Sequence, residues 1–132
     1  MAELDYAFLA EYATVQGTKL TAVGASFTHV TVPGFPGVMR LFVAGRFRAT
    51  VDEADVPISV RLVSPAPGID IQLEGTLDPG PNLRPYNGKL GLLFAVEIPV
   101  QLSSEGLYEV YVGTDGTDGN ERRLAFAVEA RQ

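Results

Sequence analysis

The sequence predicts an all-β protein, an antiparallel β-sandwich of two sheets that forms a single domain over residues 1–132. Three observations support this. Apolar and polar residues alternate with a period of two over six segments, turns rich in glycine and proline separate the segments, and no helical crossover of about 12 residues lies between any two of them. We expect a sandwich of immunoglobulin-like or C2-like type with about eight strands.

The alternation is clearest at residues 39–51, where apolar side chains share one face and arginines take the other. Because successive side chains of a strand point to opposite faces, such a segment has one face in the core. We expect five mid-strand residues in one core: Phe47, Ile71, Phe94, Val110 and Phe126. The predicted strands span residues 4–14, 19–31, 39–51, 56–64, 69–77, 89–100, 106–113 and 122–129.

The first 15 residues fit two structures. Leu4, Phe8 and Tyr12 are spaced for a helical stripe, but with Tyr6 they also fit one face of a strand. No strong helix N-cap precedes them. The segment Gln16-Gly17-Thr18 is typical of a hairpin turn, which favours a strand and leaves the helix as the alternative.

Turn chemistry separates the predicted strands. Glycine, proline, asparagine and aspartate cluster at Pro33–Gly37, Pro65–Gly68, Asp78–Pro81 and Asp115–Asn120. Connections this short join antiparallel neighbours. We therefore expect strands that follow one another in sequence to run mostly antiparallel.

Composition argues against several classes of function. The chain has no cysteine, which excludes disulfides and thiolate chemistry, and its net charge of −6 disfavours binding to nucleic acid or to anionic membranes. No stretch is long and apolar enough to insert into a membrane, and residues 1–6 lack the features of a signal peptide. We expect a cytoplasmic protein without a cofactor.

No catalytic constellation is found. His29 is the only histidine, and none of the serines lies in a nucleophile-elbow pattern. We expect His29 to lie on the surface or on an edge strand. An enzyme built on carboxylates, such as a glycosidase, needs a groove for which a chain of this size leaves little room. We therefore expect a protein that is not an enzyme.

Two acidic loops provide one candidate site. Asp52 and Asp55 lie in the loop at residues 52–55, and Asp115 and Asp118 lie in the loop at residues 114–121. In an alternating antiparallel order both loops lie at the same end of the domain. Carboxylate oxygens are the ligands that Ca²⁺ prefers. A domain that binds Ca²⁺, a carbohydrate or another small ligand is the alternative function, although solvated turns explain the same residues.

Three apolar residues provide the other candidate site. If the strands at 89–100 and 106–113 pair, Leu93, Leu107 and Tyr111 form an apolar patch on the outer face. Such patches on soluble domains mark protein contacts. A second copy, another protein or the N-terminal segment of the same chain could cover this patch. The first interpretation is therefore a non-catalytic interaction or assembly module that binds a protein partner or self-associates.

Several segments resemble a known family. They are the opening Ala2–Ala13 (AELDYAFLAEYA), the following Gly17–Ala25 (GTKLTAVGA), Phe35-Pro36-Gly37 and the closing Gly106–Val110 (GLYEV). Together they are similar to a bacterial family of small all-β domains of unknown function. The resemblance implies a small β-domain and supplies no activity, cofactor or catalytic residue.

Overall fold

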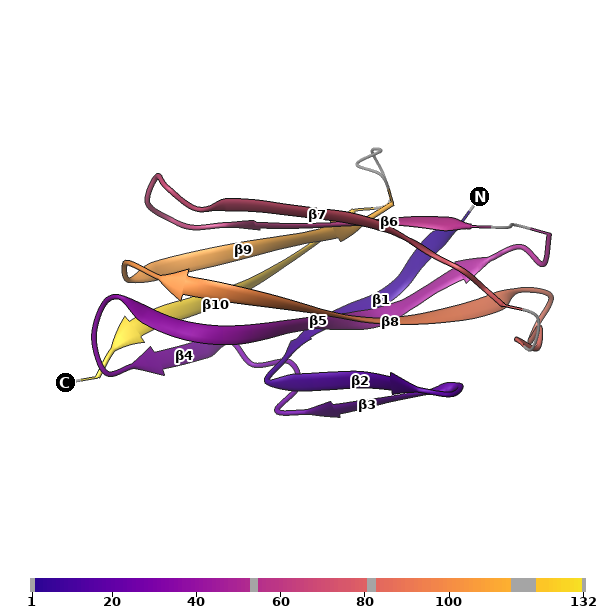
Figure 1. Ribbon diagram of the computed structural model, residues 1–132, viewed down its shortest axis with the longest axis horizontal. Coiled ribbons are helices and arrows are strands. Elements are labelled where there is room, and N and C mark those ends of the chain that lie inside the picture. Colours follow the sequence, from indigo (N-terminus) through magenta and orange to yellow (C-terminus); the bar gives the residue numbers. More distant parts are fainter. Residues whose placement is uncertain (1, 53–54, 81–82, 115–120, 132) are drawn as a thin grey trace.

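The structure is a computed structural model that describes residues 2–52, 55–80, 83–114 and 121–131. These ranges contain strands and no helix, which confirms the all-β prediction and leaves no helix in them that could cross a membrane. Figure 1 labels the ten strands. They are β1 (Glu3–Ala10), β2 (Tyr12–Gln16), β3 (Lys19–Val23), β4 (His29–Val32), β5 (Gly37–Ala49), β6 (Val56–Val63), β7 (Asp70–Leu77), β8 (Leu90–Leu102), β9 (Gly106–Gly113) and β10 (Arg122–Ala130).

The strands form three sheets. One sheet has three strands in the order β1-β5-β8, the second has five in the order β4-β10-β9-β6-β7, and β2 pairs with β3 in a separate hairpin. The two larger sheets lie face to face, and the hairpin lies on the far side of the three-stranded sheet (Figure 1). All pairs are antiparallel except β4 with β10, which is parallel. The prediction of an antiparallel sandwich is therefore wrong for this one pair. β4 and β10 are far apart in sequence, so they need no local crossover to run in the same direction.

The first two predicted strands are each divided in two. Glu11 separates β1 from β2, and its backbone N–H donates to the carbonyl of Val23, 3.0 Å away. Residues 24–28 separate β3 from β4, where Gly24 has a φ of 61° and the N–H of Ser26 donates to the carbonyl of Leu9 at 2.6 Å. The chain leaves the β2–β3 hairpin here and enters the five-stranded sheet. The described chain thus has ten strands rather than about eight, and the helical alternative for residues 4–15 is wrong.

Side chains from both larger sheets form the core. Phe47 and Phe94 from the three-stranded sheet and Val110 and Phe126 from the five-stranded sheet are buried in one cluster, as the alternation predicts. Ile71 packs against this cluster but is only half-buried, because β7 is an edge strand.

Tyr108 fixes the corner between the two larger sheets. Its ring is fully buried and stacks on Phe126, with the ring centroids 5.4 Å apart. Its hydroxyl donates to the backbone carbonyl of Ser104, 2.9 Å away. The turn after β8 is thereby tied to β9 in the opposite sheet, and the buried phenol keeps a hydrogen-bond partner.

Candidate functional site

The predicted apolar patch does not form. Leu93 lies on β8 in the three-stranded sheet, whereas Leu107 and Tyr111 lie on β9 in the five-stranded sheet. The pairing on which the patch depended is absent between these two strands, because the corner at Ser104 carries the chain from one sheet to the other. Alternation predicts which side chains face the core, but it does not predict which strands pair.

The hairpin β2–β3 covers the outer side of β8. Ala10, Ala13 and Ala44 are buried together where the hairpin meets the sheet, and Leu20 and Ala95 pack against them. Small side chains allow the hairpin to approach the sheet closely. The N-terminal segment of the same chain is therefore the cover on this face.

Charged groups surround Tyr111 on the opposite outer face. The pairing register places Arg61 on one side of Tyr111 and Arg123 on the other. The Tyr111 hydroxyl donates to a Glu109 carboxylate oxygen at 3.2 Å, and Arg123 forms an ion pair with the same carboxylate. The hydrogen bonds from Arg123 and then Tyr111 lower the pKa of Glu109. Leu107 is exposed near the start of the strand, and self-association through these residues stays a prediction.

The register places the loops that follow β5, β7 and β9 at one end of the molecule, here called the loop pole. Asp52 and Asp55 are exposed there, while Asp115 and Asp118 lie outside the described residues. A hydrogen bond from Thr50 is the main cause of a lowered pKa at Asp52. In the described ranges no three acidic or histidine side chains come together as a metal site, and Ca²⁺ binding stays a prediction.

His29 lies exposed on β4, an edge strand, as the sequence predicted. Its Nδ1 is 2.9 Å from the hydroxyl oxygen of Thr28. The residue is at the side of an open hollow of about 680 Å³ between β4 and β5, whose lining includes Phe27 and Met39. The lining of this hollow includes no serine, and the hydroxyl beside the His29 ring belongs to Thr28, its neighbour in the sequence.

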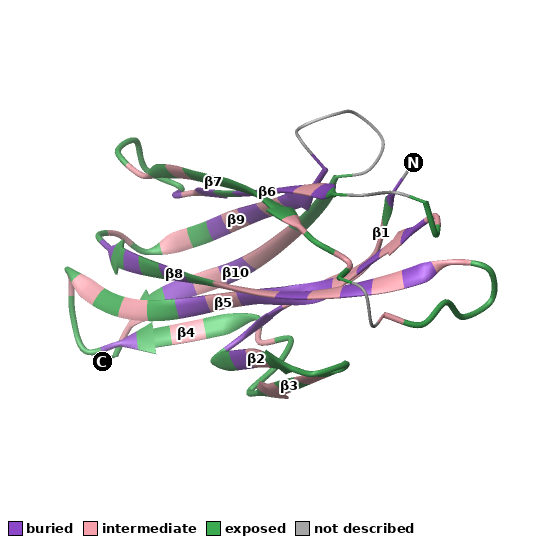
Figure 2. Ribbon diagram, turned by 45° about the vertical axis from the view of Figure 1, so that its right-hand side comes forward, coloured by how far each residue is buried: buried purple, intermediate pink, exposed green. Residues whose placement is uncertain are grey.

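The edge of β8 that faces away from β5 is the most distinctive feature of the fold. β8 is 13 residues long, and within the described chain only β5 pairs with it. The facing sheet extends one strand further, to β7. The inner side of β7 therefore projects past the last strand of the sheet opposite. Leu73 is 38% exposed although it pairs with Val60, which is 2% exposed and shares its face. Along its length β7 is mostly exposed, whereas the neighbouring β6 is mostly buried (Figure 2).

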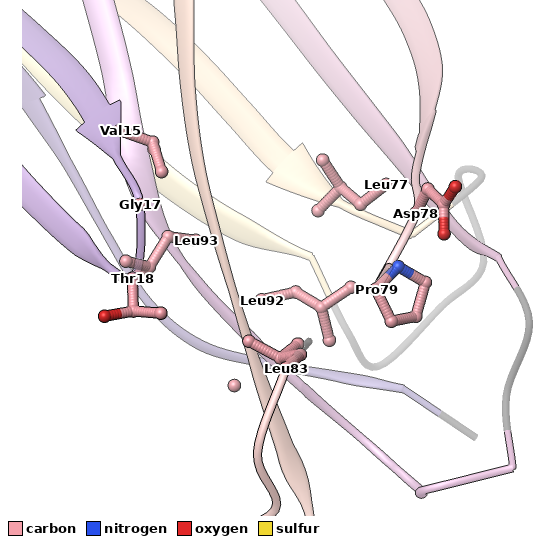
Figure 3. Close-up of a pocket in the computed structure, with 10 residues that line it drawn as sticks. Val15, Gly17, Thr18, Leu77, Asp78, Pro79, Leu83, Leu92 and Leu93 are labelled. Atoms are coloured by element: carbon pink, nitrogen blue, oxygen red, sulfur yellow. The ribbon is translucent and has the colours of Figure 1, made fainter. Parts of the chain in front are cut away.

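Two hollows lie between β7 and β8. The one at the loop pole, here called the pole hollow, measures about 200 Å³ and has a largely apolar lining. Figure 3 shows Leu93 and Val15 on one side of the β8 ribbon and Leu92 and Leu77 on the other. The second hollow measures about 310 Å³ and lies at the opposite ends of the two strands, where its lining includes Ile71. A hollow therefore borders the open edge of β8 at each of its two ends.

Proline positions agree with this arrangement. Pro99 lies within β8, and a proline nitrogen cannot donate to a neighbouring strand. Prolines within sheets are confined to edges, so we infer that residue 99 directs its backbone away from β5. Because backbone direction alternates, Leu93, Ala95 and Glu97 direct their N–H and C=O groups the same way, toward the open edge. Pro99 was the one sequence signal that could have identified β8 as an edge strand.

The fold and its surface define a small all-β protein with two facing sheets and with a strand edge that is unpaired among the described residues. A family of unknown function, DUF6941, matches this sequence over residues 5–128. The chain belongs to this family, which confirms the resemblance drawn from its opening and closing segments. No curated protein gives a significant match.

Proposed function

We propose that the protein is a non-catalytic interaction module that binds an extended segment of a partner protein as an added strand along the open edge of β8. The observation that carries this proposal is the unequal width of the two sheets. An extra strand on β8 would lie opposite β7 and cover Ile71, Leu73 and Leu77. Main-chain hydrogen bonds would supply affinity, and the two hollows would select side chains.

Strand order supports an immunoglobulin-like sandwich for this module. In immunoglobulin domains one sheet contains strands A, B, E and D, and the other contains C, F and G. The orders β1-β5-β8 and β10-β9-β6 correspond to A-B-E and G-F-C, with β7 as an additional strand beside C. The hydrogen bond from Tyr108 to Ser104 matches the tyrosine corner of strand F. The position beside β8 is then the place of strand D, which this chain leaves open in its described part.

The walls of the pole hollow favour a thin, extended occupant over a second whole domain. The hairpin turn at Gly17 and Thr18 flanks the edge on one side, and Pro79 and Leu83 flank it on the other. A single strand fits between such walls more easily than the edge of another sandwich does. We also retain the expectation of a cytoplasmic protein that is not an enzyme, which rests on the sequence alone.

The test selects random ten-residue peptides on the parent protein and measures their affinity for two variants at one position. Glu97→Pro removes an outward-facing donor, whereas Glu97→Thr removes the same carboxylate and keeps the donor. We expect the selected peptides to bind Glu97→Pro at least about 10-fold more weakly, the equivalent of about 1.4 kcal/mol. They should bind Glu97→Thr with nearly the affinity of the parent, and both variants should melt near the parent.

Hydrogen exchange provides a second measurement, in case Glu97→Pro loses its fold. The amides of Leu93, Ala95 and Glu97 should exchange quickly in the free protein and slowly with peptide bound. The amides of Phe94 and Val96 should be protected in both states. Peptides that protect β4 instead, or a parent that dimerises through β8 and binds no peptide, would contradict the proposal.

A further inference from the structure

A cluster of charged and aromatic side chains lies on the outer face of the three-stranded sheet, near the start of β8. We call it the arginine–tyrosine cluster. It consists of Glu3, Asp5, Tyr6, Arg46, Arg48, Tyr86 and Lys89. Three cations face two carboxylates in it, in a protein whose net charge is −6. This local excess of positive charge runs against the charge of the whole chain.

A tight turn brings Tyr86 onto the sheet. Asn87 and Gly88 have φ values of 48° and 79°, and Tyr86 and Lys89 exchange backbone hydrogen bonds of 2.8 and 2.9 Å. This is the two-residue turn that asparagine followed by glycine favours. Gly91 leaves room beneath it, since a Cβ there would lie 3.3 Å from the Tyr86 ring and 3.2 Å from Cδ of Arg46. The ring of Tyr86 is thus held over the sheet beside both arginines.

Arg46 is fully occupied within the cluster. The centre of its guanidinium lies 5.1 Å from the centroid of the Tyr6 ring and 5.3 Å from that of Tyr86. Its Nε donates to the carboxylate of Asp5 at 2.9 Å, and Nη2 donates to the same carboxylate. This arginine fastens β1 and the loop before β8 to the sheet, so its role is structural.

Arg48 is different. Its guanidinium lies 5.9 Å from the Tyr86 ring centroid, and its Nη1 is 3.8 Å from Oε1 of Glu3, too far for a hydrogen bond. Its Nε is buried and has no hydrogen-bond partner in the described part of the chain. A buried donor without a partner costs free energy, and arginine presents its donors in a fork that matches an oxyanion. The Nε of Arg48 is therefore a donor without an acceptor among the described residues, and its Nη1 has only the longer ion pair with Glu3.

The geometry points to an oxyanion-binding site in which the guanidinium of Arg48 binds a carboxylate or phosphate group through two hydrogen bonds. Lys89 would contribute the second charge, because its Nζ lies 3.4 Å from the same Glu3 oxygen that Arg48 approaches. Glu3 occupies the margin of the site and is 48% exposed, so it can move aside for an incoming anion. The exposed ring of Tyr86 offers a stacking surface for the rest of the ligand. This site does not depend on the strand-binding proposal.

The experiment titrates the full chain with inorganic phosphate and, separately, with acetate at constant ionic strength, and follows the Arg Nε–H signals by NMR. We expect saturable binding in which the Arg48 signal shifts, and the relative affinities identify which oxyanion the site prefers. Arg48→Lys keeps the charge but loses the paired donors, and it should bind at least 10-fold more weakly. Arg61→Lys on the other sheet is the matched control and should bind like the parent.

A second pair of variants tests whether the affinity for the anion can be raised. Glu3→Gln removes the competing carboxylate and should raise the affinity several-fold, whereas Glu129→Gln, which changes the net charge equally at a distant exposed position, should leave it unchanged. This pair keeps the inference testable even if Arg48→Lys loses its fold. Failure of both anions to saturate, or equal affinity in the parent, Arg48→Lys and Glu3→Gln proteins, would overturn the inference.

Discussion

At the scale of single residues, Glu109 shows how an outer face can be stabilised by charge. Arg123 and Tyr111 both donate to its carboxylate and lower its pKa. A carboxylate with a lowered pKa stabilises the fold at pH values above its unfolded pKa of about 4.3. That contribution is lost as the pH falls through the lower pKa of the folded state. Acid should therefore weaken this link between β9 and β10.

The corresponding prediction concerns Glu109→Gln. This variant should melt below the parent at pH 7, and the difference should shrink as the pH falls through the lowered pKa of the folded state, where the parent's carboxylate becomes protonated as well. Melting curves of both proteins from pH 3 to pH 7 measure the effect. Glu129→Gln is the control on β10 and should follow the parent throughout. A difference between Glu109→Gln and the parent that stays constant with pH would show that Glu109 acts through packing alone.

Burial of individual residues was predictable from sequence where both sheets cover the position. Phe47 and Phe126 lie mid-strand in apolar rows and are fully buried. Leu73 lies in an equally regular row but is 38% exposed, because the strand that would cover it is absent from the described sheet. Alternation reports the direction of a side chain, whereas burial also depends on what lies opposite.

At the scale of elements, the hairpin β2–β3 depends on a surface of small side chains. Ala44 is fully buried beneath it, beside Ala13 and Ala10. Ala44→Glu would place a carboxylate where there is no room for it and no water to solvate it. We expect the hairpin to detach while the two larger sheets stay folded, with a loss of about 2 kcal/mol. Hydrogen exchange should accelerate at Lys19–Val23 and stay slow in β9.

A matched control for this variant lies on the same face of the same strand. Val38 is 79% exposed, beyond the reach of the hairpin's buried contacts. Val38→Glu should leave both the melting temperature and the exchange of the hairpin unchanged. If Ala44→Glu also left them unchanged, the hairpin would not depend on the packing seen here.

The hairpin itself was only partly predictable. The turn at Gln16–Thr18 was clear from its glycine, and the strands on either side of it are present. Neither Glu11 nor Gly24 was predicted to end a strand, because each break depends on contacts across the fold. The side chain of Glu11 packs against Gly24, where any Cβ would collide with it. Local propensity cannot anticipate a contact between residues that are 13 positions apart in different loops.

At the scale of the whole molecule, sheet order decides the candidate site, and sheet order was the least predictable property. The sequence predicted a common pole for the loops, since that follows from alternating strand direction. It did not predict that β5 is the one described strand that pairs with β8, because the chain crosses between the sheets at a corner that resembles an ordinary turn. The open edge therefore became visible only when all the strands were placed together.

The unequal width of the sheets leads to a final prediction about how stability is distributed. Phe126 is fully buried between the sheets, so Phe126→Ala should cost about 3–5 kcal/mol. Leu73 faces the same interior but lies opposite an open position, so Leu73→Ala should cost only about 1 kcal/mol. Urea denaturation of the two variants measures both values. With a selected peptide bound along β8, Leu73→Ala should lose more stability than it does alone, because the added strand buries the side chain that the variant lacks. An equal loss with and without peptide would mean that the peptide binds elsewhere.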